Sequence, residues 1–416
     1  MTGLYAALHF LVDGLCALAM FGKFIPEEGG YFYILLYNFC AFALQMPLGV
    51  LLDALNHLYG KRRRRGNGGR GKPDYAFLTA GTGVLCTILG GVTHPVILGI
   101  GNALFHVGGG VGTIREDHAA NRRGAWLGVF VAPGALGLYL GNLIAAGSRA
   151  GRYGWSLWFS GVSIFMLFLL WVGKLRLQGH PFILKEDVQK QPGSGHGNEG
   201  MSRLQPERAC GDNPVSEPEN VCRRYQVQPR TESMYRKSMC GKNPAQPQPV
   251  WRNVRLAICS LLVVILRSYI GMAVGFPWKT GVLAGLLSVL ALVGGKIAGG
   301  FLAAGAGASR TAVISLVMAA LCYLFSSWMP AGLAALFLFN MTMPITLYWV
   351  VCAFPQMPGF AFGFLTFALF LGFLPGYFEL QPLWNGNGIG CAGSVLSLLL
   401  LTAGTGKGGR GEKLSG

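Results

Sequence analysis

Twelve long apolar runs constrain this chain more than any other feature of its sequence. A helix needs about 20 apolar residues to cross the hydrocarbon core of a bilayer, and each run approaches that length. The runs cover residues 5–25, 31–55, 75–92, 96–114, 125–146 and 155–172, and then 254–276, 282–304, 312–329, 331–354, 359–380 and 389–403. The sequence therefore predicts an all-α integral membrane protein with twelve transmembrane helices in two six-helix halves.

Composition excludes an ordinary soluble protein. Charged residues make up 12% of the 416 residues, against roughly 25% in a typical soluble domain. A soluble globule of this size would have too few charges to cover its surface. The 63 glycines fit the same interpretation, because membrane helices tolerate glycine better than soluble helices do.

A polar interval separates the two groups of runs. It is rich in Pro, Gln, Ser and Gly and cannot bury enough apolar surface to order itself, so we expect a disordered linker. The expected organisation is an N-terminal half at residues 1–175, a cytoplasmic linker at 176–251, a C-terminal half at 252–404 and a cytoplasmic tail at 405–416. Repeated halves are common in secondary transporters.

The positive charges are orientation signals. A net charge of +17 could indicate a nucleic-acid partner, but almost all the charges lie between the apolar runs. One set of alternate loops and tails holds 28 Lys and Arg residues and the other set holds 4. Because basic loops stay in the cytoplasm, we expect both termini there, in a plasma or inner cell membrane. We interpret the basic run at residues 61–65 as a contact for lipid phosphates, with no nucleic acid bound.

Five ionisable residues lie well inside the apolar runs, away from their ends, where each charge costs about 2.5–3.5 kcal/mol on insertion scales. They are His9, Asp13, His106, Arg267 and Lys296. His9 and Asp13 are four residues apart and therefore share a helix face, so the pair could hold and pass a proton. We expect Arg267 to be the counter-charge of Asp13. The two side chains would form either an ion pair that breaks and re-forms during transport or a permanent structural pair.

The remaining polar groups suggest a solute site. Asn102 and His106 share a helix face, and we take both as candidate substrate ligands; the alternative for His106 is a packed, hydrogen-bonded side chain. Arg267 could bind a carboxylate, phosphate or phosphonate through two parallel hydrogen bonds, which predicts an anionic small molecule. We expect Lys296, towards the cytoplasmic end of its run, to extend its ammonium out of the membrane.

Two motifs resemble the major facilitator superfamily. Gly49-Val-Leu-Leu-Asp53 followed by Gly60-Lys61-Arg62-Arg63 is similar to the signature between its second and third helices. The run from Gly128 through Pro133 to Gly137 is similar to its antiporter motif. The resemblance implies the major facilitator fold and makes Gly49, Asp53, Gly128, Pro133 and Gly137 candidate residues for conformational gating.

A narrower resemblance points to the fosmidomycin-resistance group of efflux proteins. It rests on His9-Phe-Leu-Val-Asp13, on Gly101-Asn-Ala-Leu-Phe-His106 and on Arg267-Ser-Tyr. The resemblance implies proton-coupled efflux by alternating access.

The sequence leaves three classes of function open. We expect a secondary active transporter, with Asp13 and His9 coupling protons to the movement of a small solute. One rival is an integral membrane enzyme that uses His9, Asp13 and His106 as acid–base or metal-binding groups, although we expect no metal and no cofactor. Another is a receptor or assembly protein that transports nothing. No Gly-x-x-x-x-Gly-Lys-Ser/Thr loop is present, so energy would come from a gradient rather than from ATP.

The charge bias makes the topology testable with thiol labelling. Cys210, Cys222 and Cys240 lie in the linker, and we expect a membrane-impermeant maleimide to leave them unlabelled on intact cells and to label them after permeabilisation. A cysteine introduced by Lys279→Cys, in a loop predicted to be outside, is the positive control. Labelling of the linker cysteines on intact cells would reverse the predicted topology.

Overall fold

The computed structural model describes residues 1–63, 74–151, 154–179, 250–380 and 386–406. Within these ranges the chain forms helices and no strand, which confirms the all-α prediction. Most of the predicted linker at 176–251 and of the predicted tail at 405–416 lies outside the described residues.

The first six predicted spans all contain helix, and two of them include a short π-helical segment. Their elements are α1 (Thr2–Ala19), η1 (Met20–Phe24), α2 (Gly30–Asn38), η2 (Phe39–Ala43), α3 (Gln45–Arg63), α4 (Tyr75–Val92), α5 (Pro95–Ala119), α6 (Ala125–Val131), α7 (Pro133–Arg149) and α8 (Trp155–Gly179).

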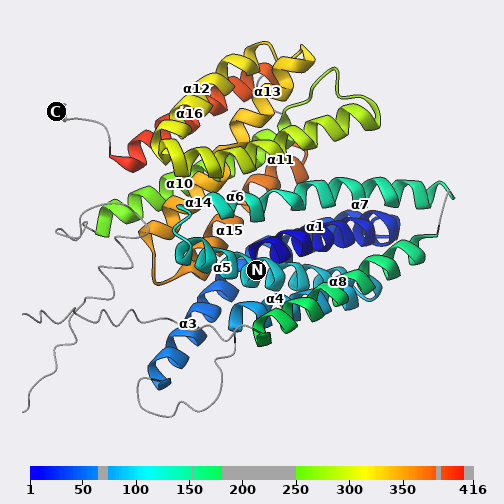
Figure 1. Cartoon of the computed structure of the whole chain (residues 1–416). Coiled ribbons are helices and arrows are strands. Elements are labelled where there is room, and N and C mark those ends of the chain that lie inside the picture. The colour runs from blue at the N-terminus through cyan, green and yellow to red at the C-terminus, as the bar shows by residue number, and fades with distance from the viewer. Residues whose placement is uncertain (64–73, 152–153, 180–249, 381–385, 407–416) are drawn as a thin grey trace, which may run out of the picture.

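The second group of spans is helical as well. Its elements are α10 (Val250–Ala273), α11 (Gly281–Ala306), α12 (Ala308–Leu324), α13 (Met329–Asn340), α14 (Thr342–Ala353), α15 (Pro358–Tyr377) and α16 (Gly386–Thr405). In Figure 1 the helices of residues 250–406 lie largely in the upper part of the bundle and those of residues 1–179 in the lower part.

Eleven of the described helical segments are long and apolar enough to cross a membrane, and α12, with 17 residues, is slightly shorter. The predicted span 312–329 is wrong at both ends, since α12 begins at Ala308 and ends at Leu324. The chain turns at Ser326, whose carbonyl accepts a hydrogen bond from the Trp278 ring N–H at 2.8 Å. Pro330 then lies in the first turn of α13, where its missing N–H costs little.

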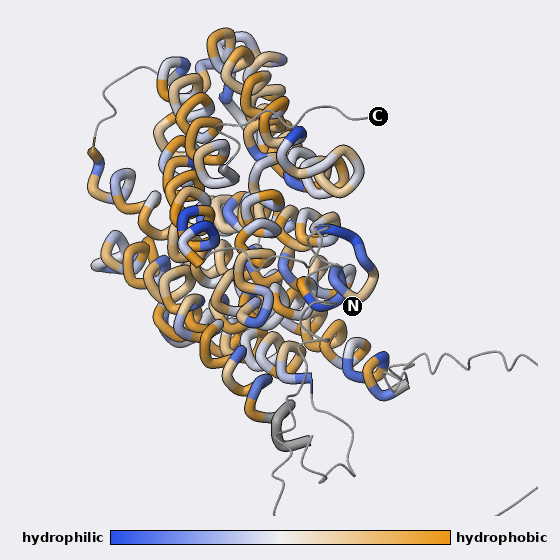
Figure 2. The backbone as a smooth tube through the Cα atoms, turned by 90° about the vertical axis from the view of Figure 1, so that its left-hand side faces the viewer, coloured by the Kyte–Doolittle hydropathy of each residue, from blue (hydrophilic) through white to orange (hydrophobic). Residues whose placement is uncertain are grey.

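The outer faces of the bundle are apolar. Large hydrophobic side chains are exposed along the helices, including Leu157 at 74% and Leu283 at 71%. Figure 2 shows hydrophobic residues along most of the helical tube and hydrophilic ones concentrated near the helix ends. A soluble protein rarely exposes so much contiguous apolar surface, so these faces fit contact with lipid.

Two contacts between the halves occur where α3 meets α15. A Cβ on Gly49 would overlap the Gly359 carbonyl, so the two backbones touch. The carboxylate of Asp53 accepts hydrogen bonds from the backbone N–H groups of Gly359 at 2.9 Å and Phe360 at 2.8 Å. Asp53 therefore caps the N-terminus of a helix that belongs to the other half.

The broken fifth span contacts the other half through α6 and its own half through α7. A Cβ on Gly128 of α6 would overlap the Lys296 carbonyl of α11, and a Cβ on Gly137 of α7 would overlap the Phe10 carbonyl of α1. The Tyr139 hydroxyl donates to the Val282 carbonyl at 2.6 Å. The candidate gating residues thus lie where helices approach most closely.

Loss of the Asp53 cap should loosen the first turn of α15. We expect Asp53→Ala to lower the free energy of unfolding by about 0.5–2 kcal/mol and to speed hydrogen exchange at Gly359 and Phe360, measured by mass spectrometry. Asp74→Ala is the matched control, because Asp74 caps α4 within its own half and its loss should leave exchange in α15 unchanged. Equal exchange in wild type and Asp53→Ala would contradict this role.

Candidate functional site

The break between α6 and α7 exposes backbone carbonyls inside the bundle. Pro133 begins α7 and has no N–H to donate, and the last carbonyls of α6 have no partner within that helix. His9 Nδ1 lies 2.6 Å from the Phe130 carbonyl, and Lys296 Nζ donates to the Val131 carbonyl at 3.2 Å. The break therefore holds an ionisable side chain from α1 beside one from α11.

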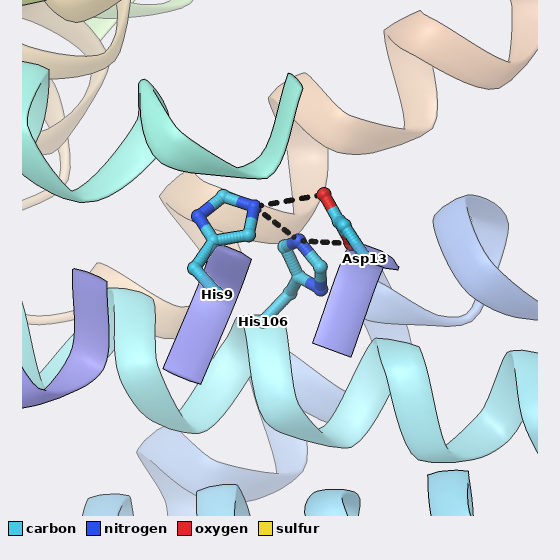
Figure 3. A group of neighbouring side chains, drawn as sticks. All are labelled: His9, Asp13 and His106. Atoms are coloured by element: carbon cyan, nitrogen blue, oxygen red, sulfur yellow. Dashed lines mark hydrogen bonds and ion pairs between the residues drawn. The ribbon is translucent and has the colours of Figure 1, made fainter. Parts of the chain in front are cut away.

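His9, Asp13 and His106 form a compact cluster, the triad shown in Figure 3. His9 Nε2 lies 3.2 Å from Asp13 Oδ2, and His106 Nε2 lies 3.6 Å from Asp13 Oδ1. The two Nε2 atoms are 2.8 Å apart, and the imidazole rings meet edge to face. Helices α1 and α5 thus bring together three of the residues that the sequence singled out.

Backbone contacts determine the tautomers of both histidines. His9 Nδ1 faces the Phe130 carbonyl, and His106 Nδ1 faces the Asn102 carbonyl at 2.8 Å. A carbonyl oxygen only accepts, so both Nδ1 atoms must carry a proton. Each neutral ring then has a lone pair on Nε2, and the two Nε2 atoms lie 2.8 Å apart with no proton between them.

One additional proton removes the repulsion between the two Nε2 atoms. Placed on either Nε2, it forms an N–H···N hydrogen bond between the rings, and the positive charge lies beside the Asp13 carboxylate. The triad then carries no net charge, and without that proton it carries one negative charge. The geometry can therefore bind and release a single proton.

The polar groups around Asp13 are side chains other than Arg267. The Asn102 amide donates to Asp13 Oδ1 at 3.0 Å, in addition to the two histidine contacts. Among the described residues no ion pair joins Asp13 to Arg267, which corrects the permanent pair expected as one alternative, whereas the reversible pair stays a prediction. The physical reason is the packing of α5 on α1, which places His106 and Asn102 against the carboxylate first.

A cavity of about 220 Å³ lies beside the triad. Its side walls come from both halves and are mainly apolar. The ionisable residues that line it are His9, Asp13, His106, Arg267 and Lys296. Among the described residues that line the cavity, Asp13 is the only acid, and its side chain is 20% exposed. Asn102 is not in the lining; it lies behind Asp13.

Arg267 lines the cavity, and one of its donors is buried in the wall without an acceptor among the described residues. The side chain is only 7% exposed, and Nη1 is buried with no acceptor among the described residues. A buried charged group without a partner is strongly unfavourable. The guanidinium therefore has capacity for an acceptor from a bound molecule.

The expectation for Lys296 is wrong. Its ammonium does not extend out of the membrane but lines the cavity and binds the Val131 carbonyl. The freed carbonyl supplies an acceptor within the bundle, which removes the need to reach water. Its position near the middle of α11 was a signal in the sequence that favoured this placement.

Gly134 was missed by the sequence analysis as a site residue. A Cβ there would overlap Asp13 Oδ2 and His9 Nε2. The absence of a side chain allows α7 to pack directly on the triad and to line the cavity. Only the three-dimensional packing of α7 on α1 makes this requirement visible.

A divalent cation is a second chemistry to test against the triad. One ligand atom from each residue lies within 4.8 Å of the others. In a tetrahedral zinc site with Zn–N distances of about 2.0–2.1 Å, two nitrogen ligands lie roughly 3.3 Å apart. The observed 2.8 Å between ring nitrogens lies in the hydrogen-bond range, so the geometry fits a proton better.

A side chain at position 134 should disrupt the triad. We expect Gly134→Ala to lower the free energy of unfolding by about 1–3 kcal/mol through overpacking and to eliminate the shared N–H···N signal in ¹⁵N NMR of histidine-labelled protein. Gly161→Ala is the control, because a Cβ there meets open space. An unchanged spectrum in Gly134→Ala would contradict the contact.

Known structures share this arrangement of helices, although no protein-family model and no curated protein matches the sequence. A crystal structure of the E. coli fucose:proton symporter FucP has 10% sequence identity and a TM-score of 0.50, with 98% of each chain covered. A crystal structure of FucP in the outward conformation, described as a major facilitator superfamily transporter, has 11% identity and a TM-score of 0.52, with 98% of this chain and 99% of that chain covered. The chain therefore adopts the major facilitator fold.

Proposed function

We propose that this protein is a secondary active transporter that moves a small solute by alternating access. The observation that carries the proposal is the cavity between the halves, lined by a proton-binding triad and by two cations. A structural protein has no need for five ionisable residues around one cavity in a membrane, where each of them is costly. The fold supports the same class of function.

Proton coupling is assigned to Asp13 and His9, with His106 completing the triad. With both Nδ1 atoms bound to carbonyls, the triad has one exchangeable proton. That proton can reach solvent through the cavity when the cavity opens to either side of the membrane. Asn102, which the sequence suggested as a substrate ligand, is proposed to position Asp13 through the 3.0 Å hydrogen bond. His106 remains a candidate substrate contact because it lines the cavity.

The solute is proposed to be anionic. Arg267 lines the cavity and forms no ion pair with a described residue, and Asp13, the one acid among the described residues of the lining, is already engaged by the histidines and Asn102. A carboxylate, phosphate or phosphonate would supply the missing acceptor through a charge-assisted hydrogen bond. A cationic solute would meet Arg267 and Lys296 without compensation.

The glycine contacts between the halves are proposed to open and close the cavity. Alternating access requires the halves to rock against each other, and α3–α15 and α6–α11 are contacts that must separate. Asp53 would release the N-terminus of α15 in that motion. Gly49, Gly128, Pro133 and Gly137 permit the close approach or the bend on which the closed arrangement depends.

The finer assignments rest on the sequence. We propose a plasma or inner cell membrane with both termini cytoplasmic, export in exchange for protons, and kinship with the fosmidomycin-resistance group. Exchange requires the proton and the solute to favour opposite-facing states. A vesicle experiment that records the sign of proton movement distinguishes exchange from cotransport.

The enzyme alternative can also be tested, because the ligand atoms of the triad lie within 4.8 Å of one another and could hold a metal ion. A membrane enzyme that used His9, Asp13 and His106 to bind a metal would purify with a stoichiometric ion and convert its substrate without a gradient. A receptor or assembly protein would bind a ligand and carry out neither transport nor conversion. Metal content and solute flux therefore separate the three functions.

Asp13→Asn should uncouple transport while leaving the fold intact. The amide has nearly the same shape but removes the charge that holds the shared proton, so we expect solute-driven proton movement to fall by about 100-fold or more. The assay uses proteoliposomes that contain a pH-sensitive dye, challenged with a panel of organic anions and cations.

The control for this assay is Glu28→Gln, an exposed acid outside the cavity, which should behave as wild type. Circular dichroism and the melting temperature verify that Asp13→Asn is folded. Proton movement at the wild-type rate in Asp13→Asn would exclude Asp13 as the coupling site.

A further inference from the structure

We propose that the solute has a doubly charged anionic head group that bridges Arg267 and Lys296. The inference rests on the proposed function only in treating the cavity as the solute site. Its starting observation is that two permanent or near-permanent cations from the same half, one on α10 and one on α11, line one cavity.

Among the described residues that line the cavity, no acid is free to neutralise this pair. Asp13 already contacts His9, His106 and Asn102, and it is the only acid in the lining. When the triad holds its proton it is neutral, so the cavity carries two positive charges. A singly charged anion would leave one of them uncompensated in a low-dielectric interior, whereas a doubly charged anion compensates both.

Lys296 has the hydrogen-bonding capacity for this role. An ammonium has three donors, and the Val131 carbonyl at 3.2 Å is its one hydrogen-bond acceptor among the described residues. Two donors therefore remain for a ligand. Arg267 belongs to the wall of the same cavity, and its guanidinium carries five N–H donors.

The remaining lining defines the body of the solute. Phe42, Leu138, Met343, Phe362 and Leu369 surround the charged groups with apolar surface. Such walls favour an apolar portion attached to the head group, since binding sites combine apolar walls with a few polar anchors. The expected solute class is an organic anion with a compact dianionic group, such as a phosphate monoester or phosphonate, on a small apolar body.

A matched pair of probes tests the charge requirement. At about pH 7.5, above the second phosphate pKa of about 6, phenyl phosphate is a dianion and methyl phenyl phosphate is a monoanion with a similar body. Calorimetry on the purified full-length protein should show that the dianion binds at least about tenfold more tightly. Equal affinities in wild type, or no binding of phenyl phosphate at millimolar concentration, would overturn the proposal.

Variants assign the preference to Lys296. We expect Lys296→Gln to weaken phenyl phosphate binding by about 10- to 100-fold and to change binding of the monoanion by less than about threefold, so that the preference disappears. Lys296→Arg should retain it. Lys279→Gln, an exposed lysine outside the cavity, is the control. A Lys296→Gln protein that still discriminates between the probes would refute the assignment.

These binding measurements need neither a membrane nor a gradient, so their outcome is separate from that of the transport assay. Discrimination between the probes without any flux would retain the dianion site and reject the transporter. Flux of anions without discrimination would retain the transporter and reject the dianion site. The wild-type comparison also decides the matter if a variant fails to fold.

Discussion

The backbone carbonyls freed at Pro133 are the constraint on which the charged centre depends. Within a membrane protein every polar group needs a partner, because lipid supplies none. The break between α6 and α7 creates two acceptors at consecutive residues, and His9 and Lys296 satisfy them. The same contact orients the His9 ring, and so it determines which nitrogen faces Asp13. A local defect in one helix thereby organises groups from two others.

The arrangement of charges follows from that constraint. With Nδ1 of both histidines bound to carbonyls, the triad holds one exchangeable proton, and Asp13 is occupied by histidines and an amide rather than by the arginine. Arg267 and Lys296 are left facing the cavity without an acidic partner. Proton binding changes the charge of the cavity lining from one positive charge to two, so within a single conformation a bound proton favours a bound anion. Exchange therefore requires a second conformation in which the bound proton no longer favours the bound anion. We propose that the closely packed glycines of α3, α6 and α15 part when the protein enters that conformation.

The fold was largely predictable, and the site only in part. Run length predicted a helix in each of the twelve places, and eleven of the described helical segments are long and apolar enough to cross a membrane, because crossing a bilayer fixes the length and apolarity of a helix. Helix ends were less predictable, as in α12, where a turn at Ser326 follows tertiary contacts. Midspan charge identified His9, Asp13, His106 and Arg267, but a periodicity places residues only on a face of their own helix. The partners of Asp13 depend on how α5 packs on α1, and the need for glycine at 134 depends on how α7 does.

The misplacement of Lys296 shows how the two proposed sites are connected. Its ammonium was expected to seek water, and it finds instead the Val131 carbonyl, next to the Phe130 carbonyl that holds His9. In the proposed alternating access, a rotation of α6 against α7 changes both hydrogen bonds together, because Phe130 and Val131 both belong to the last turn of α6. Such a rotation is coupled to the opposite half through the contact of Gly128 with α11. A proton on the triad and an anion on Lys296 would therefore act on one hinge, which gives transport a physical means of making each ligand sensitive to the other.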